Sequence, residues 1–256
     1  MKKILVMILA LALGLTIAGC GGKSETMSKI QKEGKIVWGT NAEFAPFEMR
    51  SGDKVIGVDA EIAKKVAEKL GVELVVEDMD FGGLISALNA KQIDFIGAGF
   101  TVNAEREEQV LFTKKYFKAV QVIIVKEDNT DINGPDDLAD KKVGVQENTT
   151  GDFIASDELV SESGEVIRFM SPMEAVLDLK NSRIDAIVID NLPAQYLVAQ
   201  NPGLKILEEK AGEDEEYAMA VRKGDDDLKK VIDEVLEELI ASGQIDEWVE
   251  EYSLLD

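Results

Sequence analysis

Two stretches of this chain alternate short apolar strand patterns with amphipathic helix patterns. In the first stretch the strand and helix patterns follow one another at residues 35–40, 59–70, 72–76, 84–90 and 93–97. The helix pattern at 59–70 places Ile62, Val66 and Leu70 on one face and stops at Gly71. Strands that alternate with helices pair in parallel and are buried on both faces. The alternation therefore predicts an α/β fold built on a mainly parallel sheet.

A second stretch repeats this alternation further along the chain. Its strand and helix patterns lie at residues 142–146, 152–159, 166–169, 173–180, 186–189 and 192–199. A β-branched run at 119–125 lies between the two stretches, and another extended segment at 217–221 follows the second. The chain is therefore predicted to leave a first lobe, build a second lobe and return. An apolar stripe at 228–240, ending at Gly243, predicts a closing helix that we assign to the first lobe.

The predicted organisation is two lobes, each a mainly parallel sheet flanked by helices, joined by two hinge strands. Lobe 1 is assigned to residues 35–118 and 217–256, and lobe 2 to residues 119–216, with the crossovers near 116–122 and 213–218. A cleft between two lobes is a common place for a small-molecule site and a natural hinge.

The first twenty residues predict secretion and a lipid anchor. Lys2-Lys3 is a positive start, and the apolar run at 4–17 is too short to span a membrane comfortably. Ile17-Ala18-Gly19-Cys20 then resembles the bacterial lipoprotein pattern, in which the cysteine receives the lipid. An ordinary signal peptide or a short membrane anchor is the alternative. The predicted segments are a lipoprotein signal peptide over residues 1–19 and a lipidated N-terminus with its tether over residues 20–34.

Composition excludes several kinds of function. A formal net charge of −22 argues against a nucleic-acid surface, because phosphate binding needs clustered lysines and arginines. The chain has no histidine, and its single cysteine is Cys20, so catalytic triads and histidine metal sites are excluded. Carboxylate or lysine chemistry remains open. We predict no cofactor and no nucleic-acid partner.

One segment has the spacing of a calcium loop. Asn129, Asp131 and Asn133-Gly134 are followed by Asp140 at the twelfth position. The string begins with Asn and ends with Asp, where the motif has Asp and Glu, and a strand pattern precedes it instead of a helix. We therefore predict a polar turn here and no metal site.

Five segments, in this order and spacing, resemble the polar amino-acid substrate-binding proteins of ABC transporters, solute-binding protein family 3. They are GTNAEFAPFE (39–48), GVD (57–59), MDFGGLI (79–85), GAGFTVNAER (97–106) and VQENTTG (145–151). The similarity covers almost the whole mature chain. Val58 stands where an aromatic residue is usual, and Asn148 where the loop usually has glycine. Asn tolerates the left-handed backbone conformation, so that loop can still form.

The resemblance implies a fold and a function. The fold is that of a type II periplasmic binding protein, and the function is capture of a free amino acid by closure of the clamp, followed by recognition by an ABC permease. We predict a monomer that meets the membrane through its lipid anchor only. Two alternatives stay open: an enzyme on the same scaffold, such as a dehydratase, and a sensor module that shares every site residue.

The resemblance also assigns roles to individual residues. Arg106 matches the arginine that binds the ligand α-carboxylate, and Asp190 matches the acid that pairs with the α-ammonium. Phe44 and Phe81 match the aromatic residues on either side of the ligand side chain. The start of a helix at Thr149-Thr150-Gly151 suits a carboxylate. The full predicted binding set is Asn41, Glu43, Phe44, Phe81, Gly99, Phe100, Thr101, Arg106, Gln146, Thr149, Thr150 and Asp190.

The identity of the amino acid is predicted from a few of these residues. Arginine binders of the family resemble the chain at Glu43-Phe44 and at Gln146, and glutamine binders resemble it at Met79-Asp80-Phe81. Glu43 is one residue from the predicted aromatic wall, so its carboxylate could meet a stacked guanidinium. We predict arginine or lysine, with glutamine or another polar amino acid as the alternative.

Overall fold

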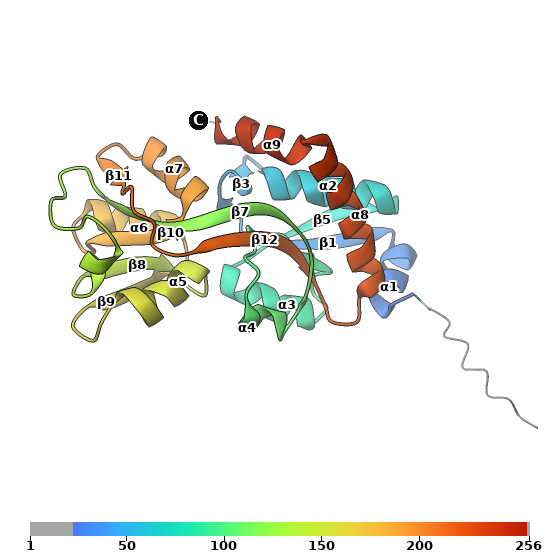
Figure 1. Cartoon of the computed structure of the whole chain (residues 1–256). Helices are drawn as coiled ribbons and strands as arrows, with labels where there is room; N and C mark the ends of the chain where they lie inside the picture. The colour runs from blue at the N-terminus through green and yellow to red at the C-terminus, as the bar shows by residue number, and fades with distance from the viewer. Residues whose placement is uncertain (1–22, 255–256) are drawn as a thin grey trace, which may run out of the picture.

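The computed structural model of this chain describes residues 23–254 and forms an α/β fold (Figure 1). The strands are β1 Lys35–Thr40, β2 Glu43–Phe44, β3 Glu48–Ser51, β4 Lys54–Ile56, β5 Glu73–Asp78, β6 Phe95–Ile96, β7 Leu111–Lys126, β8 Lys142–Gln146, β9 Glu165–Phe169, β10 Ala186–Asp190, β11 Leu204–Ile206 and β12 Asp214–Val221. The helices are α1 Glu25–Glu33, α2 Val58–Leu70, α3 Leu84–Asn89, α4 Ala104–Glu107, α5 Thr150–Ile154, α6 Pro172–Lys180, α7 Asn191–Gln200, α8 Asp226–Ser242 and α9 Gln244–Ser253. The predicted signal peptide and Cys20 lie outside the described residues.

The first group of elements, called lobe 1 from here on, is built on the parallel strands β5, β1 and β6, with β12 antiparallel beside β6. Side chains of β1 alternate between the faces of this sheet. Trp38 packs in one core cluster with Ile62 of α2 and Ile232 of α8, whereas Val37 packs in another with Leu84 of α3. Helices therefore cover both faces, which leaves the carboxyl ends of β1 and β6 to carry the site.

The second group, lobe 2, is built on the parallel strands β10, β8 and β9. Val143 and Val188 face one core cluster together with Ala155, just after α5, whereas Ile187 faces α6 and α7 on the other side. The helix predicted at 152–159 is α5 continued by a π-helical turn, Ala155–Leu159. The prediction of an α/β fold with mainly parallel strands is confirmed.

Two long strands, β7 and β12, join the lobes (Figure 1). They run antiparallel to one another, with Tyr217 opposite Phe117 and Glu215 opposite Ala119. Beyond this pairing β7 continues into lobe 2, where it pairs with β10 and β11. Hydrogen bonds therefore connect strands in the order β5-β1-β6-β12-β7-β10-β8-β9, and the predicted crossover at 119–125 is the second half of one strand.

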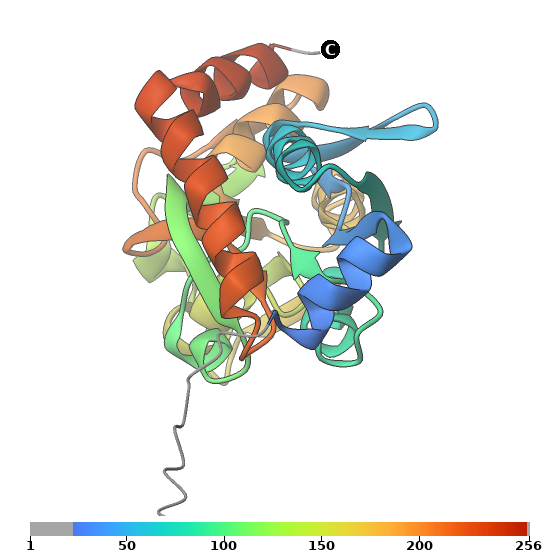
Figure 2. The same ribbon diagram turned by 90° about the vertical axis from the view of Figure 1, so that its right-hand side faces the viewer.

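The predicted tether over residues 20–34 is wrong for residues 25–33, which form helix α1. The Ser24 side chain caps its first turn, and Gly34, with φ of 68°, ends it. Met27 and Ile30 are buried against lobe 1, and Figure 2 shows α1 beside α8. This apolar pair, three residues apart in a polar segment, was the signal for a packed helix.

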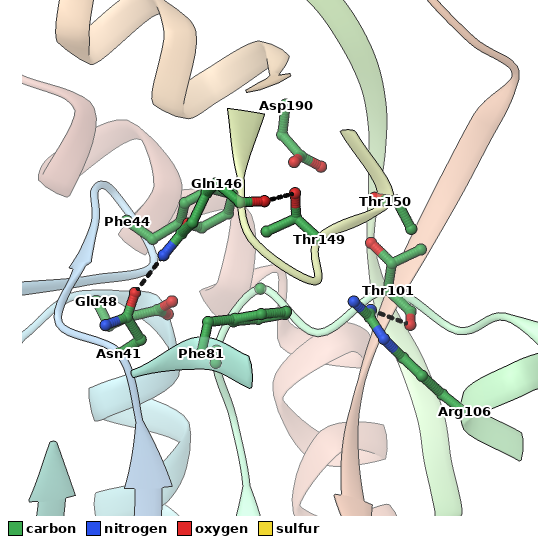
Figure 3. Close-up of a pocket in the computed structure, with 12 residues that line it drawn as sticks. Asn41, Phe44, Glu48, Phe81, Thr101, Arg106, Gln146, Thr149, Thr150 and Asp190 are labelled. Atoms are coloured by element: carbon green, nitrogen blue, oxygen red, sulfur yellow. Dashed lines mark hydrogen bonds between the residues drawn. The ribbon is translucent and has the colours of Figure 1, made fainter. Parts of the chain in front are cut away.

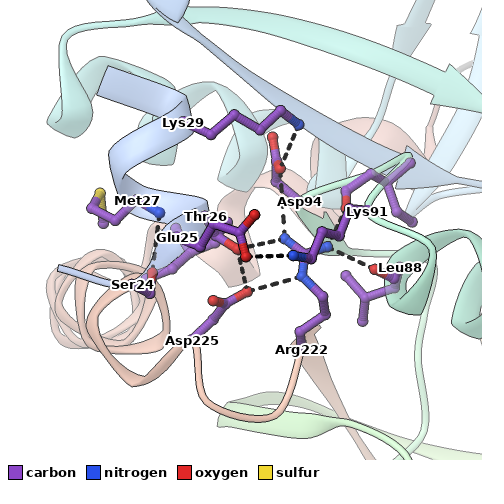
Figure 4. A network of polar contacts seen from close by, with 12 residues as sticks. Ser24, Glu25, Thr26, Met27, Lys29, Leu88, Lys91, Asp94, Arg222 and Asp225 are labelled. Carbon is purple, nitrogen blue, oxygen red and sulfur yellow. Dashed lines mark hydrogen bonds and ion pairs between the residues drawn. The ribbon is translucent and has the colours of Figure 1, made fainter. Parts of the chain in front are cut away.

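A buried polar network fastens α1 to lobe 1 (Figure 4). Thr26 donates to Asp225 at 2.7 Å and accepts from the guanidinium of Arg222 at 2.7 Å. Arg222 also donates to two backbone carbonyls, and Lys29 forms an ion pair with buried Asp94 at 3.2 Å. Each buried charge thus has a partner, as burial of ionised groups requires.

The closing helix ends before Gly243 as predicted, but another helix, α9, follows it. Gly243 has φ of 75°, a conformation that favours glycine, and it separates the two helices. Ile245, Trp248 and Tyr252 are buried at helical spacing, a pattern that could have indicated α9. Within residues 23–254, no helix combines the length and apolar character needed to cross a bilayer.

Candidate functional site

A small cavity lies between the two lobes, at the carboxyl ends of their parallel strands (Figure 3). Ligands of open α/β sheets bind at such strand ends. All of the predicted binding residues except Glu43 and Phe100 line this cavity. The lining residues are Asn41, Phe44, Glu48, Phe81, Ala98, Gly99, Thr101, Arg106, Gln146, Thr149, Thr150 and Asp190.

Arg106 is buried at the lobe 1 side of the cavity. It lies on α4, which the Asn103 side chain caps by accepting from the Arg106 backbone N–H at 2.8 Å. Its guanidinium donates to the carbonyl of Thr101 at 2.8 Å and lies 4.4 Å from the centroid of the Phe100 ring. Burial lowers the pKa of Arg106 to about 10, against the opposing charges of Glu215 and Asp190, so the side chain stays charged at neutral pH.

Phe100 therefore has a different place from the predicted one. Its side chain is buried and packs between Phe81 and Phe112, with ring centroids 5.7 Å from each. It does not line the cavity. The Phe100 ring instead packs against the guanidinium of Arg106. This guanidinium has five N–H donors, more than the carbonyls of Thr101 and Asn148 accept, so donors remain for a ligand.

Asp190 closes the lobe 2 side of the cavity, at the end of β10. Its Oδ1 accepts a hydrogen bond from the hydroxyl of Tyr217 at 2.6 Å. Burial, followed by the charge of Glu215, raises the pKa of Asp190 to about 7, although the bond from Tyr217 opposes this. A cation that entered the cavity would favour the ionised form.

The loop before α5 has the backbone conformation expected of its sequence. Asn148 has φ of 64°, so it tolerates the left-handed conformation where the family usually has glycine. Thr149 is the N-cap of α5, since its side chain accepts from the backbone N–H of Asp152 at 3.3 Å. Thr150 is the first residue of the helix and is buried.

Direct hydrogen bonds cross the cleft, so the structure is in a closed arrangement. Gln146 of lobe 2 donates to the Asn41 side chain at 2.8 Å (Figure 3). Arg106 of lobe 1 donates to the carbonyl of Asn148 at 3.0 Å. Both bonds involve predicted binding residues, and both require the lobes to be in contact.

Glu48 lines the cavity and was absent from the predicted set. Its side chain is fully buried, and no group within residues 23–254 donates a hydrogen bond to either carboxyl oxygen. Burial, together with the charge of neighbouring Asp59, raises the pKa of Glu48 well above its usual range. Asp59 itself accepts from Tyr116 at 2.6 Å and from the Gly99 backbone at 3.0 Å, and burial raises its pKa to about 6.

Strand pairing explains why Glu48 and not Glu43 faces the cavity. In the hairpin of β2 and β3, Phe44 pairs with Glu48 and Glu43 pairs with Met49. Residues directly opposite in an antiparallel pair share a face, and neighbours along a strand face opposite ways. Glu43 is consequently exposed and lines a separate groove with Arg50.

Gly99 allows an aromatic wall to approach the backbone closely. Its φ is 51°, and a Cβ at this position would lie 2.7 Å from the Phe44 ring. A side chain here would displace Phe44 from the cavity.

The calcium-like string forms the predicted polar turn. The Asn129 side-chain oxygen accepts from the backbone N–H groups of Asp131 and Ile132, at 3.2 and 3.1 Å. The Asp137 carboxylate accepts from the backbone of Asn133 at 2.8 Å. These bonds use the side chains to close the turn.

Comparison with known proteins identifies the family. Residues 36–254 match the sequence model of the bacterial extracellular solute-binding proteins, family 3. The chain belongs to this family. This solute-binding protein is 32% identical over 249 residues to the arginine-binding extracellular protein ArtP of Bacillus subtilis, and the match covers 96% of each chain.

Solved structures agree with the fold of this solute-binding protein. Holo ArgBP from T. maritima has a TM-score of 0.79 and 39% sequence identity, over 86% of this chain and 98% of that chain. The amino-acid ABC transporter substrate-binding protein AbpA from Streptococcus pneumoniae, bound to L-arginine, has a TM-score of 0.84 and 30% identity, over 88% and 97% of the two chains. The prediction of family and fold is confirmed.

Proposed function

We propose that this protein captures a free cationic amino acid, arginine or lysine, outside the cell and presents it to the permease of an ABC importer. One observation carries the choice of ligand: the buried guanidinium of Arg106 and the buried carboxyl group of Glu48, to which no described residue donates a hydrogen bond, lie at opposite ends of one cavity (Figure 3). A ligand with a carboxylate at one end and a cation at the other satisfies both groups.

The rest of the ligand meets groups of matching chemistry. Asp190 lines the same cavity as Arg106, and its charge acts on Arg106, so Asp190 is the proposed partner for the α-ammonium. Phe81 lies between Glu48 and Arg106 in Figure 3. An aromatic wall suits the aliphatic part of arginine or lysine and can stack on a guanidinium. The names of the relatives support the proposal, because ArtP is described as arginine-binding, a truncated ArgBP was solved in an arginine-bound form, and AbpA is bound to L-arginine.

The mechanism we propose is closure and recognition, without a reaction on the ligand. An amino acid binds to lobe 1 in an open form, lobe 2 closes over it, and the permease recognises the closed form. The bonds from Gln146 to Asn41 and from Arg106 to Asn148 would form as the lobes close. A dehydratase-like enzyme is the competing function, because a carboxyl group with the pKa of Asp190 can act as an acid.

A thermal-shift panel of all common amino acids on the ligand-free protein tests the proposed ligand. Preferential binding to the folded state raises the melting temperature, and at a fixed ligand concentration the increase is larger for a ligand that binds more tightly. We expect arginine or lysine to give the largest increase. If glutamine outranks both, the cationic specificity is wrong and amino-acid binding stands. The same incubations, followed by mass spectrometry, should return every ligand unchanged; turnover would favour the enzyme.

We also propose that lipidation of Cys20 anchors the protein to the cell membrane. The only cysteine of the chain stands where the lipoprotein pattern requires it. The Cys20→Ala variant should lose the lipid and be released from the membrane fraction or mislocalised, which fractionation and immunoblotting measure. A variant that stays with the membrane at unchanged electrophoretic mobility would rule out the anchor.

A further inference from the structure

A carboxylate that does not line the cavity lies on one of the two strands that join the lobes. Glu215 stands on β12, opposite Ala119 of β7, and is half-buried. Its Oε2 atom accepts hydrogen bonds from the hydroxyl groups of Thr101 and Thr150, at 3.0 and 2.9 Å. The Gln121 amide approaches the same oxygen at 3.4 Å. Several donors therefore converge on one carboxylate oxygen.

The two threonines belong to different lobes. Thr101 follows β6 in lobe 1, whereas Thr150 begins α5 in lobe 2. Both are almost fully buried and both line the cavity (Figure 3). Glu215, on a strand that joins the lobes, thus accepts a hydrogen bond from one cavity-lining threonine of each lobe.

These bonds are suited to holding the lobes together. A carboxylate only accepts hydrogen bonds, so the single proton of each threonine hydroxyl is directed at Glu215. Bonds to an ionised acceptor are about twice as strong as bonds between neutral groups. The Gln121 amide also donates to the Thr150 hydroxyl at 3.1 Å, which fixes that hydroxyl from a second side.

The position of Glu215 separates it from the other links across the cleft. Gln146, Asn41 and Arg106 line the cavity, so a ligand competes for their hydrogen bonds. Glu215 is not among the residues that line the cavity, although the two threonines that donate to it are. Because Glu215 itself does not line the cavity, it acts on the ligand only through the two threonines, whatever side chain the ligand carries.

We propose that Glu215 is a hinge latch, a positioning residue that stabilises the closed form by linking Thr101 of lobe 1 to Thr150 of lobe 2. The proposal rests on the proposed function in one respect, that the closed form is the form that retains the ligand. The latch affects the residence time of any bound amino acid and does not choose among amino acids. It is distinct in this way from Glu48.

The Glu215→Ala variant tests the latch, with Glu216→Ala as its matched control. Glu216 precedes the same buried segment of β12, but its carboxylate pairs with Lys115 on the surface. Loss of charge-assisted hydrogen bonds should raise the dissociation rate constant of Glu215→Ala about tenfold, for L-arginine and L-glutamine alike where both bind. Glu215→Gln should fall between this variant and wild type, because an amide oxygen still accepts. Glu216→Ala should dissociate at the wild-type rate.

Small-angle X-ray scattering of the ligand-free proteins gives a measurement that needs no ligand. Glu215→Ala should have a larger radius of gyration than wild type and Glu216→Ala, because the open form gains population. If no amino acid binds the wild-type protein, the proposed function is wrong. The scattering of the ligand-free proteins then shows by itself whether Glu215 stabilises the closed form. Unchanged dissociation with unchanged scattering in folded Glu215→Ala overturns the latch. Tighter binding also overturns it, since Glu215 would then compete with the ligand.

Discussion

Replacing Arg106 by alanine is expected to abolish amino-acid binding while the protein stays folded. A carboxylate in a closed cavity loses a planar, charged partner, and such losses cost on the order of 2 to 5 kcal/mol. Arg106→Lys should also fail substantially, because an ammonium group cannot offer two parallel N–H donors to a carboxylate. Isothermal titration calorimetry measures the affinity. Circular dichroism, recorded while the protein is heated, measures whether the variant is folded and at what temperature it melts.

The matched control for this prediction is Arg183→Ala. Arg183 has an exposed side chain that pairs with Asp178 at 2.9 Å, and it does not line the cavity. Its removal should leave affinity unchanged. Local packing could also suffer in Arg106→Ala, since the guanidinium bonds Thr101 and stacks on Phe100. Near wild-type affinity in a folded Arg106→Ala would remove Arg106 from the binding site.

Periodicity predicted those elements of the fold that bury a long apolar face. The runs around β1, β8 and β10 are buried on both faces of a sheet, and α2 buries one long apolar face, so their patterns are strong. Helix α1 was missed because only Met27 and Ile30 face the core, while buried polar bonds between Thr26, Arg222 and Asp225 supply the remaining contacts. Such bonds join residues about two hundred positions apart and leave no local pattern.

The resemblance to the solute-binding family predicted most of the residues that line the cavity, which composition alone could not do. Arg106 stands in an acidic helical segment, Glu105-Arg106-Glu107-Glu108, that resembles a solvated surface. In the structure it is buried, and its guanidinium lies over the Phe100 ring and donates to the Thr101 carbonyl. Phe100 and Arg106 are coupled by this packing, and sequence order could not separate the residue that lines the cavity from the residue that supports it.

The choice between Glu43 and Glu48 depended on a hairpin that was not predicted. Without strand pairing, proximity to Phe44 favoured Glu43. With Phe44 opposite Glu48, the alternation of side chains turns Glu43 to solvent and Glu48 into the cavity. A period of two starting from Phe44 would have indicated the same face, so the signal was present but short.

Replacing Glu48 by glutamine is the second change with a large expected effect. Burial holds the pKa of Glu48 well above its usual range in the empty protein, so the neutral acid and the glutamine amide are nearly equivalent there. Stability should therefore change little. Arginine should bind more weakly by roughly 2 to 5 kcal/mol, because the amide leaves a buried guanidinium unpaired, whereas glutamine should bind almost as before.

Glu43→Gln is the matched control, since Glu43 lies on the same hairpin but is exposed. It should leave both affinities unchanged. Calorimetry with L-arginine and L-glutamine on the three proteins gives the comparison. If Glu43→Gln loses the preference for arginine and Glu48→Gln keeps it, Glu43 is the partner of the ligand cation and the assignment of Glu48 is wrong.

The same carboxyl groups predict how affinity depends on pH. A cationic ligand favours ionised Glu48 and Asp190, so binding lowers their pKa values and releases protons when the empty protein holds them. Above the raised pKa values the groups are already ionised and affinity is constant. As pH falls through about 7, where Asp190 titrates, protons compete with the ligand and affinity falls.

Asp190 meets the α-ammonium of every amino acid, so glutamine should share this part of the decline. The additional decline for arginine belongs to Glu48 and should vanish in Glu48→Gln, as should the additional proton release measured in buffers of different ionisation enthalpy. An identical pH dependence of arginine binding in wild type and Glu48→Gln would show that Glu48 does not meet the cation.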